Sequence, residues 1–288
     1  MSNSVTHHSA DYRLAPAVIS QRDGILRADD FDDLYFSADN GLAETEHVFL
    51  CGNQIAKRLT GVAHFTIAET GFGTGLNFLA VMSLLENMAK KQAPICQIDY
   101  VSFEAHPLPH DIMDKSHQAF PAIEQQSKKL LAALPPFWPG LHRCDFLGGK
   151  LRLHLIFGDA NAAITNADFI ADAWFLDGFS PAKNPELWNR DLLLNVGRLT
   201  RAGGSFATFT AAGAVHQNLA DAGFHVKKLK GFCRKRDMLI GCKLGTSNPV
   251  TSDGARQPSR AGQTIGIIGA GVAGAALAAG LANRGARP

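Results

Sequence analysis

Long apolar runs, paired cysteines and a strong charge imbalance are all missing from this chain of 288 residues. Its longest apolar stretch, residues 265–281, is interrupted by glycines and alanines, and no run approaches the roughly 20 residues that span a bilayer. The first residues, MSNSVTHHSADYRL, lack the basic-then-apolar order of a secretory signal. We therefore expect a cytoplasmic protein with no membrane partner.

The cysteines and histidines give no sign of a metal or disulfide framework. The five cysteines are scattered and form no CxxC pair. His106, His110 and His117 lie close together, but no further ligand pattern completes a site, and packing or surface roles are favoured. We predict no metal. The net charge of +2 is too small to indicate a nucleic-acid partner by itself, because such footprints are local.

Strand and helix patterns alternate from His64 onward, after a leader that reads as irregular until a helical segment near Glu44 to Leu59. Apolar strands separated by helices predict an α/β fold with a doubly wound, mostly parallel sheet. After Leu244, a Gly-, Ser- and Pro-rich stretch predicts a linker. We expect a leader packed as a cap on the domain (1–60), the α/β domain (61–244), the linker (245–262) and the start of an incomplete second domain (263–288).

A glycine-rich turn lies between the first strong strand signal and an amphipathic helix, and reads Glu69-Thr-Gly71-Phe-Gly73-Thr-Gly75. Glycines at alternate positions let a ligand lie against the backbone, and open parallel sheets bind ligands at the carboxyl ends of their strands. The spacing differs from the G-x-G-x-x-G pattern that binds a pyrophosphate. It suits S-adenosylmethionine, a sulfonium cation without phosphate. The alternative is a structural glycine turn in another α/β protein.

Three further acids stand at the ends of later strand signals. Glu104 could accept the hydroxyls of a ribose, Asp159 could accept the adenine amino group, and Asp177 would face the cleft over the methyl donor. Each acid alone is more often a helix N-cap or a solvated turn residue. Together with Glu69, they place acids at four strand ends of one sheet, which favours a shared binding site.

Four segments carry a family resemblance: FDDLYFS in the leader, ETGFGTGLNF, GDANA and LDGFSPAKNPELW. With the second glycine turn beyond the linker, the chain resembles the MnmC family of bifunctional tRNA wobble-uridine enzymes, which make 5-methylaminomethyl-2-thiouridine. The resemblance covers residues 20–288 in order, and DGFSPAKNPELW is its most specific part. It implies a Rossmann-like methyltransferase domain that methylates the aminomethyl group of the uridine, and a flavin domain that removes a carboxymethyl group in the preceding step.

The resemblance also implies roles for matching residues. Asp177 would face the substrate amine and orient it or stabilise the developing ammonium, and a role as base stays open. Pro181 and Pro185 would stiffen the loop that carries Lys183 and Asn184, which are expected to touch anticodon nucleotides. The methionine part of S-adenosylmethionine would be held by Glu69, Gly71, Gly73 and Gly75, its ribose by Glu104, and its adenine by Asp159 and Ala160.

Cations gather in the segment KKLKGFCRKR, beside the last strand signals, with Phe232 among them as a stacking surface. They predict an edge that contacts tRNA phosphates. The alternative is an edge strand that its lysines keep from aggregating, and the segment alone favours that alternative. The cations are Lys227, Lys228, Lys230, Arg234, Lys235 and Arg236, of which the last three are the expected tRNA contacts.

The second glycine motif, Gly269, Gly271 and Gly274 after TIGII, has the G-x-G-x-x-G spacing of a dinucleotide site. It predicts the first turn of an FAD-dependent oxidoreductase domain. The residues after Gly274 are too few to supply the ribose-binding acid or a catalytic part. We therefore expect FAD to bind only in the full-length parent protein.

Three functions remain open at this point. The first is a tRNA-modifying methyltransferase, which the DGFSPAKNPELW loop and the basic edge favour. The second is a methyltransferase for a small amine, which would need no basic edge. The third is a catalytically silent tRNA-binding module, which would need neither the glycine turn nor Asp177. The sequence leaves the oligomeric state open, with a monomer favoured.

Overall fold

The structure is a computed structural model that describes residues 13–22, 25–35, 40–233 and 236–245. The residues expected to begin the FAD domain, including Gly269, Gly271 and Gly274, lie outside the described residues, as do Arg234 and Lys235. Within the described ranges, every helix is too short or too polar to span a bilayer.

One eight-stranded sheet forms the centre of the domain, with the strand order β10-β11-β9-β8-β4-β5-β7-β6. The five strands from β9 to β7 run parallel to one another, whereas β6, β10 and β11 each pair antiparallel with a neighbour. This confirms the expected doubly wound, mostly parallel α/β fold. The strands are β4 (His64–Glu69), β5 (Gln97–Glu104), β6 (Gly140–Phe146), β7 (Leu151–Phe157), β8 (Ala171–Phe175), β9 (Thr200–Thr208), β10 (Phe224–Lys230) and β11 (Asp237–Lys243).

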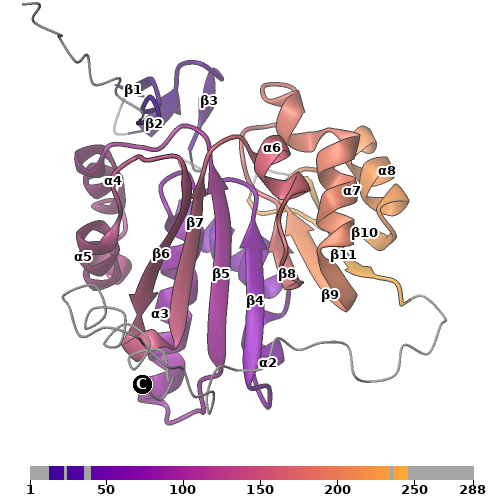
Figure 1. Cartoon of the computed structure of the whole chain (residues 1–288), viewed down its shortest axis with the longest axis horizontal. Helices are drawn as coiled ribbons and strands as arrows, with labels where there is room; N and C mark the ends of the chain where they lie inside the picture. The colour runs from indigo at the N-terminus through magenta and orange to yellow at the C-terminus, as the bar shows by residue number, and fades with distance from the viewer. Residues whose placement is uncertain (1–12, 23–24, 36–39, 234–235, 246–288) are drawn as a thin grey trace, which may run out of the picture.

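Helices cover both faces of the sheet, because its central strands are apolar on both sides. Residues of α3 and α5 share one hydrophobic cluster with β4, β5 and β7, whereas α6, α7 and α8 share a second cluster with β8 and β9 (Figure 1). The helices are α1 (Gly41–Thr45), α2 (Ile55–Arg58), α3 (Leu76–Lys90), α4 (His110–His117), α5 (Glu124–Ala133), α6 (Ala160–Thr165), α7 (Arg190–Arg198) and α8 (Gly213–Asp221), with short helical turns at Glu46–Cys51, Pro121–Ile123, Leu147–Gly149 and Pro185–Trp188.

The leader is more regular than its sequence indicates. Three short strands, β1 (Ile19–Arg22), β2 (Ile25–Ala28) and β3 (Asp33–Leu34), form an antiparallel sheet. This small sheet lies above the carboxyl ends of the parallel strands (Figure 1). Farther along, the buried side chains of Val48 and Phe49 belong to the core cluster of the large sheet. The leader therefore covers the carboxyl ends of the parallel strands and also contributes side chains to the core.

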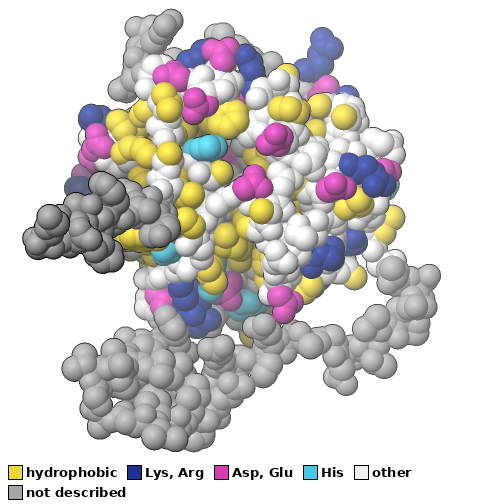
Figure 2. Space-filling model, turned by 45° about the horizontal axis from the view of Figure 1, so that its top comes forward, with side chains coloured by type: hydrophobic (Ala, Val, Ile, Leu, Met, Phe, Trp, Pro, Cys, Tyr) yellow, Lys and Arg dark blue, Asp and Glu magenta, His cyan; other side chains and the backbone are white. Residues whose placement is uncertain are grey.

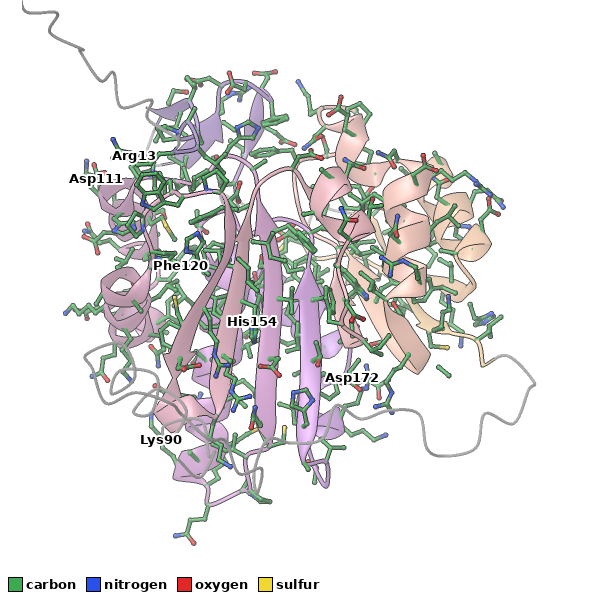
Figure 3. All side chains as sticks on the ribbon, viewed as in Figure 1. Arg13, Lys90, Asp111, Phe120, His154 and Asp172 are labelled. Atoms are coloured by element: carbon green, nitrogen blue, oxygen red, sulfur yellow. The ribbon has the colours of Figure 1, made fainter. Side chains whose placement is uncertain are left out.

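A polar cluster occupies the opposite, amino-terminal half of the large sheet. The Asp99 carboxylate pairs with Nε2 of His64 at 2.6 Å and with Nε2 of His154 at 2.8 Å. Burial raises the pKa of Asp99, but the hydrogen bonds from the two histidines outweigh it and hold the pKa below its usual range. Figure 3 shows His154 well below the carboxyl ends of the parallel strands, over which the leader sheet lies. This cluster therefore ties β4, β5 and β7 together away from the site described next.

Candidate functional site

A cavity of about 550 Å³ lies at the carboxyl ends of the parallel strands, within the ordinary size range of small-molecule sites. Residues at the ends of β4, β5, β7 and β8 meet there. Figure 2 looks toward this face, where hydrophobic and acidic side chains gather near the middle and Lys and Arg lie toward the margins. The predicted residues that line the cavity are Gly71, Gly73, Glu104, Asp159, Ala160, Asp177 and Asn184.

The glycine turn after β4 brings backbone close to the cavity. A Cβ atom on Gly71 would lie 3.3 Å from the carbonyl oxygen of Asp177, so a side chain there would crowd two strand ends. Gly73 has a φ of 52° and donates its N–H to Glu104 at 2.7 Å. Gly75 does not line the cavity, contrary to expectation. Gly75 is the N-cap of α3 and has a φ of 75°, which favours glycine. A Cβ atom on Gly75 would lie 2.9 Å from the Phe72 ring, so glycine is needed here for the packing of the turn.

Asp177 follows β8 and its carboxylate is held at both oxygens. Oδ1 accepts the N–H of Gly178 at 2.9 Å, and Oδ2 accepts the side-chain amide of Asn77 at 2.7 Å. The Thr70 hydroxyl donates to the Asp177 carbonyl at 2.7 Å and accepts its N–H at 3.1 Å. These contacts fix a half-buried carboxylate in the cavity wall directly beside the glycine turn.

Glu69 does not line the cavity, and the expected direct contact with S-adenosylmethionine is not supported. The side chain is fully buried beneath the glycine turn, where it accepts hydrogen bonds from Asn77 at 2.8 Å and from Ser102 at 2.7 Å. Burial raises the pKa of Glu69 to about 8, so the carboxyl is mainly protonated at neutral pH. Its neighbours on β4 are also buried, so Glu69 lies inside the domain at the base of the site.

The buried Glu69 predicts a pH-dependent stability. Between about pH 4.5, the ordinary value for Glu, and pH 8, the unfolded chain releases this proton while the folded chain keeps it. The pKa is raised on folding, so the free energy of unfolding falls as the pH rises through this window, at most by about 1.4 kcal/mol per pH unit.

Glu69→Gln cannot ionise and should lose this dependence. We expect its melting temperature, relative to the wild type, to rise between pH 5 and pH 8.5 in thermal denaturation. The exposed Glu46→Gln serves as the control and should show no such rise. A constant difference between Glu69→Gln and the wild type across this range would contradict the argument.

Glu104 ends β5 with both carboxyl oxygens facing backbone donors at the cavity. Oε2 accepts the N–H of Gly73 and Oε1 accepts the N–H of His106, each at 2.7 Å. Burial raises the pKa of Glu104, and these hydrogen bonds oppose the shift. A carboxylate oxygen can accept more than one hydrogen bond, so Glu104 keeps capacity for a pair of ribose hydroxyls.

Asp159 combines the two roles that the sequence left open. It is the N-cap of α6, and its Oδ1 accepts the N–H of Ala162 at 2.9 Å. The same residue lines the cavity with Ala160 and Asn161. The helix cap therefore fixes the carboxylate in the cavity wall and leaves its second oxygen for a ligand donor.

The loop after β8 contacts the leader through an ion pair, a hydrogen bond and a pair of stacked rings. Lys183 donates to Asp32 at 2.6 Å, and the N–H of Ser180 donates to Asp33 at 2.8 Å. The Phe179 ring stacks on the Phe31 ring with centroids 4.7 Å apart. Lys183 does not line the cavity, whereas the neighbouring Asn184 does. The expected contact of Lys183 with anticodon nucleotides stays a prediction, since its side chain is exposed beside this ion pair.

The sequence did not indicate several residues of the cavity wall. Tyr35 lies over the glycine turn, where a Cβ atom on Gly73 would be 3.5 Å from its ring, and burial raises its pKa with a smaller contribution from Glu104. The aromatic residues of the FDDLYFS segment were the sequence feature that could have indicated this part of the cavity wall. The lining residues that were missed include Phe31, Asp33, Tyr35, Glu44, Thr45, Asn77, Phe179 and Phe209.

The basic edge lies on β10, the outermost strand of its side of the sheet. Lys227, Lys228 and Lys230 are exposed, and Lys228 lies 3.6 Å from Asp237 on the neighbouring strand. Phe232, just beyond β10, lines the cavity, and its ring centroid lies 5.8 Å from that of His47. The residues just beyond β10 therefore reach the cavity. Arg236 is also exposed.

In the described part of the chain, no group of three or more His, Cys, Asp or Glu side chains is arranged to hold a metal ion.

Comparisons with known proteins fit this geometry. Residues 121–244 match a family model described as S-adenosyl-L-methionine-dependent methyltransferase. The chain is 41% identical over 275 residues to the tRNA 5-methylaminomethyl-2-thiouridine biosynthesis bifunctional protein MnmC of Marinobacter nauticus, covering 94% of this chain and 43% of that protein. The chain thus spans less than half the length of that relative.

A solved structure is similar as well. The crystal structure of MnmC2 from Aquifex aeolicus aligns with a TM-score of 0.62 and 24% sequence identity, over 79% of this chain and 70% of that one. At this identity the likeness concerns the fold, and it agrees with the sheet described above. The sheet and the cavity at its strand ends agree with these matches. The chain belongs to the MnmC family and carries an S-adenosyl-L-methionine-dependent methyltransferase domain.

Proposed function

We propose that this domain transfers the methyl group of S-adenosylmethionine to the amine of a 5-aminomethyl(-2-thio)uridine at the wobble position of tRNA. The observation behind the proposal is the fixed carboxylate of Asp177, which lies in the wall of the cavity beside the glycine turn. The reaction forms a bond from nitrogen to the methyl carbon and breaks the bond from that carbon to sulfur. The amine loses one proton overall.

The described residues fit S-adenosylmethionine. A Cβ atom on Gly71 would lie 3.3 Å from the carbonyl oxygen of Asp177, so glycine lets the turn pack close to Asp177, beside the place where a methionine tail would lie. Glu104 would accept the ribose hydroxyls, and Asp159 with Ala160 would border the adenine. Gly71 and Gly73 would border the methionine part, with Glu69 acting from beneath through Asn77. The bound donor would supply the electrophilic methyl group, whose transfer depends mainly on alignment.

Asp177 suits an amine nucleophile. An amine attacks only in its uncharged form and becomes a cation as the new bond forms. A carboxylate held at both oxygens can accept a hydrogen bond from the amine and stabilise that cation without reorganising. Glu44 on α1 lines the same cavity and adds a second acid near the path of a cationic substrate.

The surroundings of the cavity suit a nucleotide on a larger RNA. Aromatic rings of Phe31, Phe179 and Phe232 line the cavity and could stack on an unpaired base. The exposed lysines of β10 continue outward from Phe232 and could contact phosphates. A cytoplasmic location agrees with such a substrate. In the full-length parent protein, an FAD-dependent oxidoreductase domain would convert the carboxymethylaminomethyl form to the aminomethyl form in the preceding step.

The basic edge carries a separate prediction. Lys227→Glu with Lys230→Glu should weaken tRNA binding at least about 10-fold at low salt and flatten its salt dependence, because phosphate contacts release counterions. The dissociation constant for S-adenosylmethionine should stay unchanged. Filter binding over a range of salt concentrations measures both effects for tRNA.

Lys115→Glu with Lys128→Glu provides the matched control, because both lysines are exposed, on α4 and α5 at the opposite side of the sheet (Figure 1). It should leave tRNA affinity unchanged. Equal losses for the β10 pair and for the Lys115 and Lys128 pair would indicate a general charge effect, and no loss for the β10 pair would support the alternative of a solvated edge strand.

The test of the proposed function is methyl transfer from labelled S-adenosylmethionine by the purified chain. Three acceptors are compared: tRNA with the aminomethyl wobble uridine, the same tRNA with the carboxymethylaminomethyl form, and small amines. We expect label only in the first. Label in small amines alone would establish a small-amine methyltransferase, and donor binding without transfer to any acceptor would indicate a silent module.

A further inference from the structure

The side chain of Asn77 links three separate parts of the site. Its amide nitrogen donates to Glu69 Oε1 at 2.8 Å and to Asp177 Oδ2 at 2.7 Å, and its oxygen accepts the Thr45 hydroxyl at 2.8 Å. Both amide hydrogens and the oxygen therefore have partners. A flipped amide would place its oxygen against the Asp177 carboxylate, so the bond to Asp177 selects one orientation.

The bonds of Asn77 to Thr45 and Glu69 are shielded from water, whereas the bond to Asp177 lies at the half-buried cavity wall. Asn77 and Thr45 are each 5% exposed, and Glu69 is 0% exposed. Hydrogen bonds in such surroundings are strong, and an unpaired polar group there is costly. Asn77 therefore cannot rotate away from Asp177 without leaving the carboxyl of Glu69 or its own amide without a partner.

Asn77 also anchors the Asp177 carboxylate to the core of the domain. Asp177 lies beyond the end of β8, and its Oδ1 accepts the N–H of Gly178, the next residue in the same loop. Asn77 sits in the first turn of the long helix α3, which packs in the core. The bond from Asn77 therefore fixes the carboxylate relative to the rigid part of the domain and to the glycine turn that precedes α3.

We propose that Asn77 is a positioning residue for methyl transfer, which orients the Asp177 carboxylate toward the substrate amine, and that Thr45 of the leader holds Asn77 in this orientation. This inference rests on the proposed function, because it takes Asp177 as the group that meets the amine. It makes the leader part of the catalytic machinery, since α1 supplies Thr45.

A double-mutant cycle between Asn77 and Asp177 tests the inference. We expect Asn77→Ala to lower kcat roughly 30- to 100-fold, the cost of a misplaced catalytic group, with less effect on KM for RNA. In the Asp177→Ala background, the same change should cost less than about 3-fold, because residues that act as a unit are not additive. Residual rates are measured by single turnover with labelled donor, and thermal melts and donor binding are recorded for each variant.

Controls separate positioning from folding. Asn87→Ala changes an exposed asparagine on the same helix and should leave kcat unchanged. If Asn77→Ala fails to fold, Thr45→Val tests the same network, since it removes only the hydroxyl that orients the amide. We expect Thr45→Val to lower kcat several-fold in the wild type and not in the Asp177→Ala background.

Each outcome bears on a different claim. Equal losses from Asn77→Ala or Thr45→Val in both backgrounds would show a structural role and overturn the inference, even with an active wild type. Absence of any transfer to tRNA by the wild type would refute the proposed function instead. If the wild type methylates a small amine, the same cycle can be measured on that amine.

Discussion

Asp177→Asn should lower the rate of methyl transfer at least about 100-fold, the usual cost of removing a preorganised group that stabilises developing charge. The asparagine keeps the size of the side chain and can still accept one hydrogen bond from Asn77. It loses the negative charge that would stabilise the ammonium, and one of its side-chain positions becomes a donor. The loss should therefore appear in kcat, while donor affinity changes little.

The measurement is single-turnover transfer to aminomethyl-uridine tRNA, together with calorimetric binding of S-adenosylmethionine. Asp168→Asn is the matched control, because it makes the same chemical change at an exposed position between α6 and β8. The control should retain the wild-type rate. A loss of donor binding in Asp177→Asn as large as the loss in rate would place this carboxylate at the donor and not at the amine.

Glu104→Gln should weaken the binding of S-adenosylmethionine about 30-fold or more. The change removes a charged acceptor that holds the N–H groups of Gly73 and His106 at the cavity. Hydrogen bonds to a charged group contribute about 1.5–3 kcal/mol each, and loss of one to a ribose hydroxyl together with a looser glycine turn gives this magnitude.

Calorimetry and competition with S-adenosylhomocysteine measure this effect. Glu124→Gln, at an exposed position on α5, is the control and should bind the donor normally. The donor affinity of Asp159→Asn should lie between those of Glu104→Gln and Glu124→Gln, because asparagine also caps α6 and only the adenine contact changes. If Glu104→Gln binds S-adenosylmethionine as tightly as the wild type, the ribose does not bind at the end of β5.

The sequence predicted the parts of the site that follow directly from a parallel sheet. β4, β5, β7 and β8 are apolar strands, and the residues that follow them meet at one edge wherever strands run parallel. That geometry brought Gly71, Glu104, Asp159 and Asp177 to one cavity. The direction of Glu69 could not be predicted, because all residues of β4 after the first are buried and no alternation marks its two faces.

Contacts between distant segments were beyond sequence patterns. Lys183 and Asp32 are separated by 151 positions, and Asn77 and Asp177 by 100. The strands β1, β2 and β3 span only four, four and two residues, too few to show a period. β6 was also missed, because this edge strand mixes glycine, histidine and the charged Arg143 and Asp145 with few apolar residues. Such elements depend on the neighbours that the fold brings to them.

A crystal structure of the chain with S-adenosylhomocysteine, the demethylated product, is the most direct test of the central claim. We predict the ligand in the cavity at the strand ends, with its ribose hydroxyls on Glu104, its adenine beside Asp159 and Ala160, and its sulfur facing Asp177. A ligand bound elsewhere, or bound with its sulfur turned away from Asp177, would contradict the assignment of this cavity to methyl transfer.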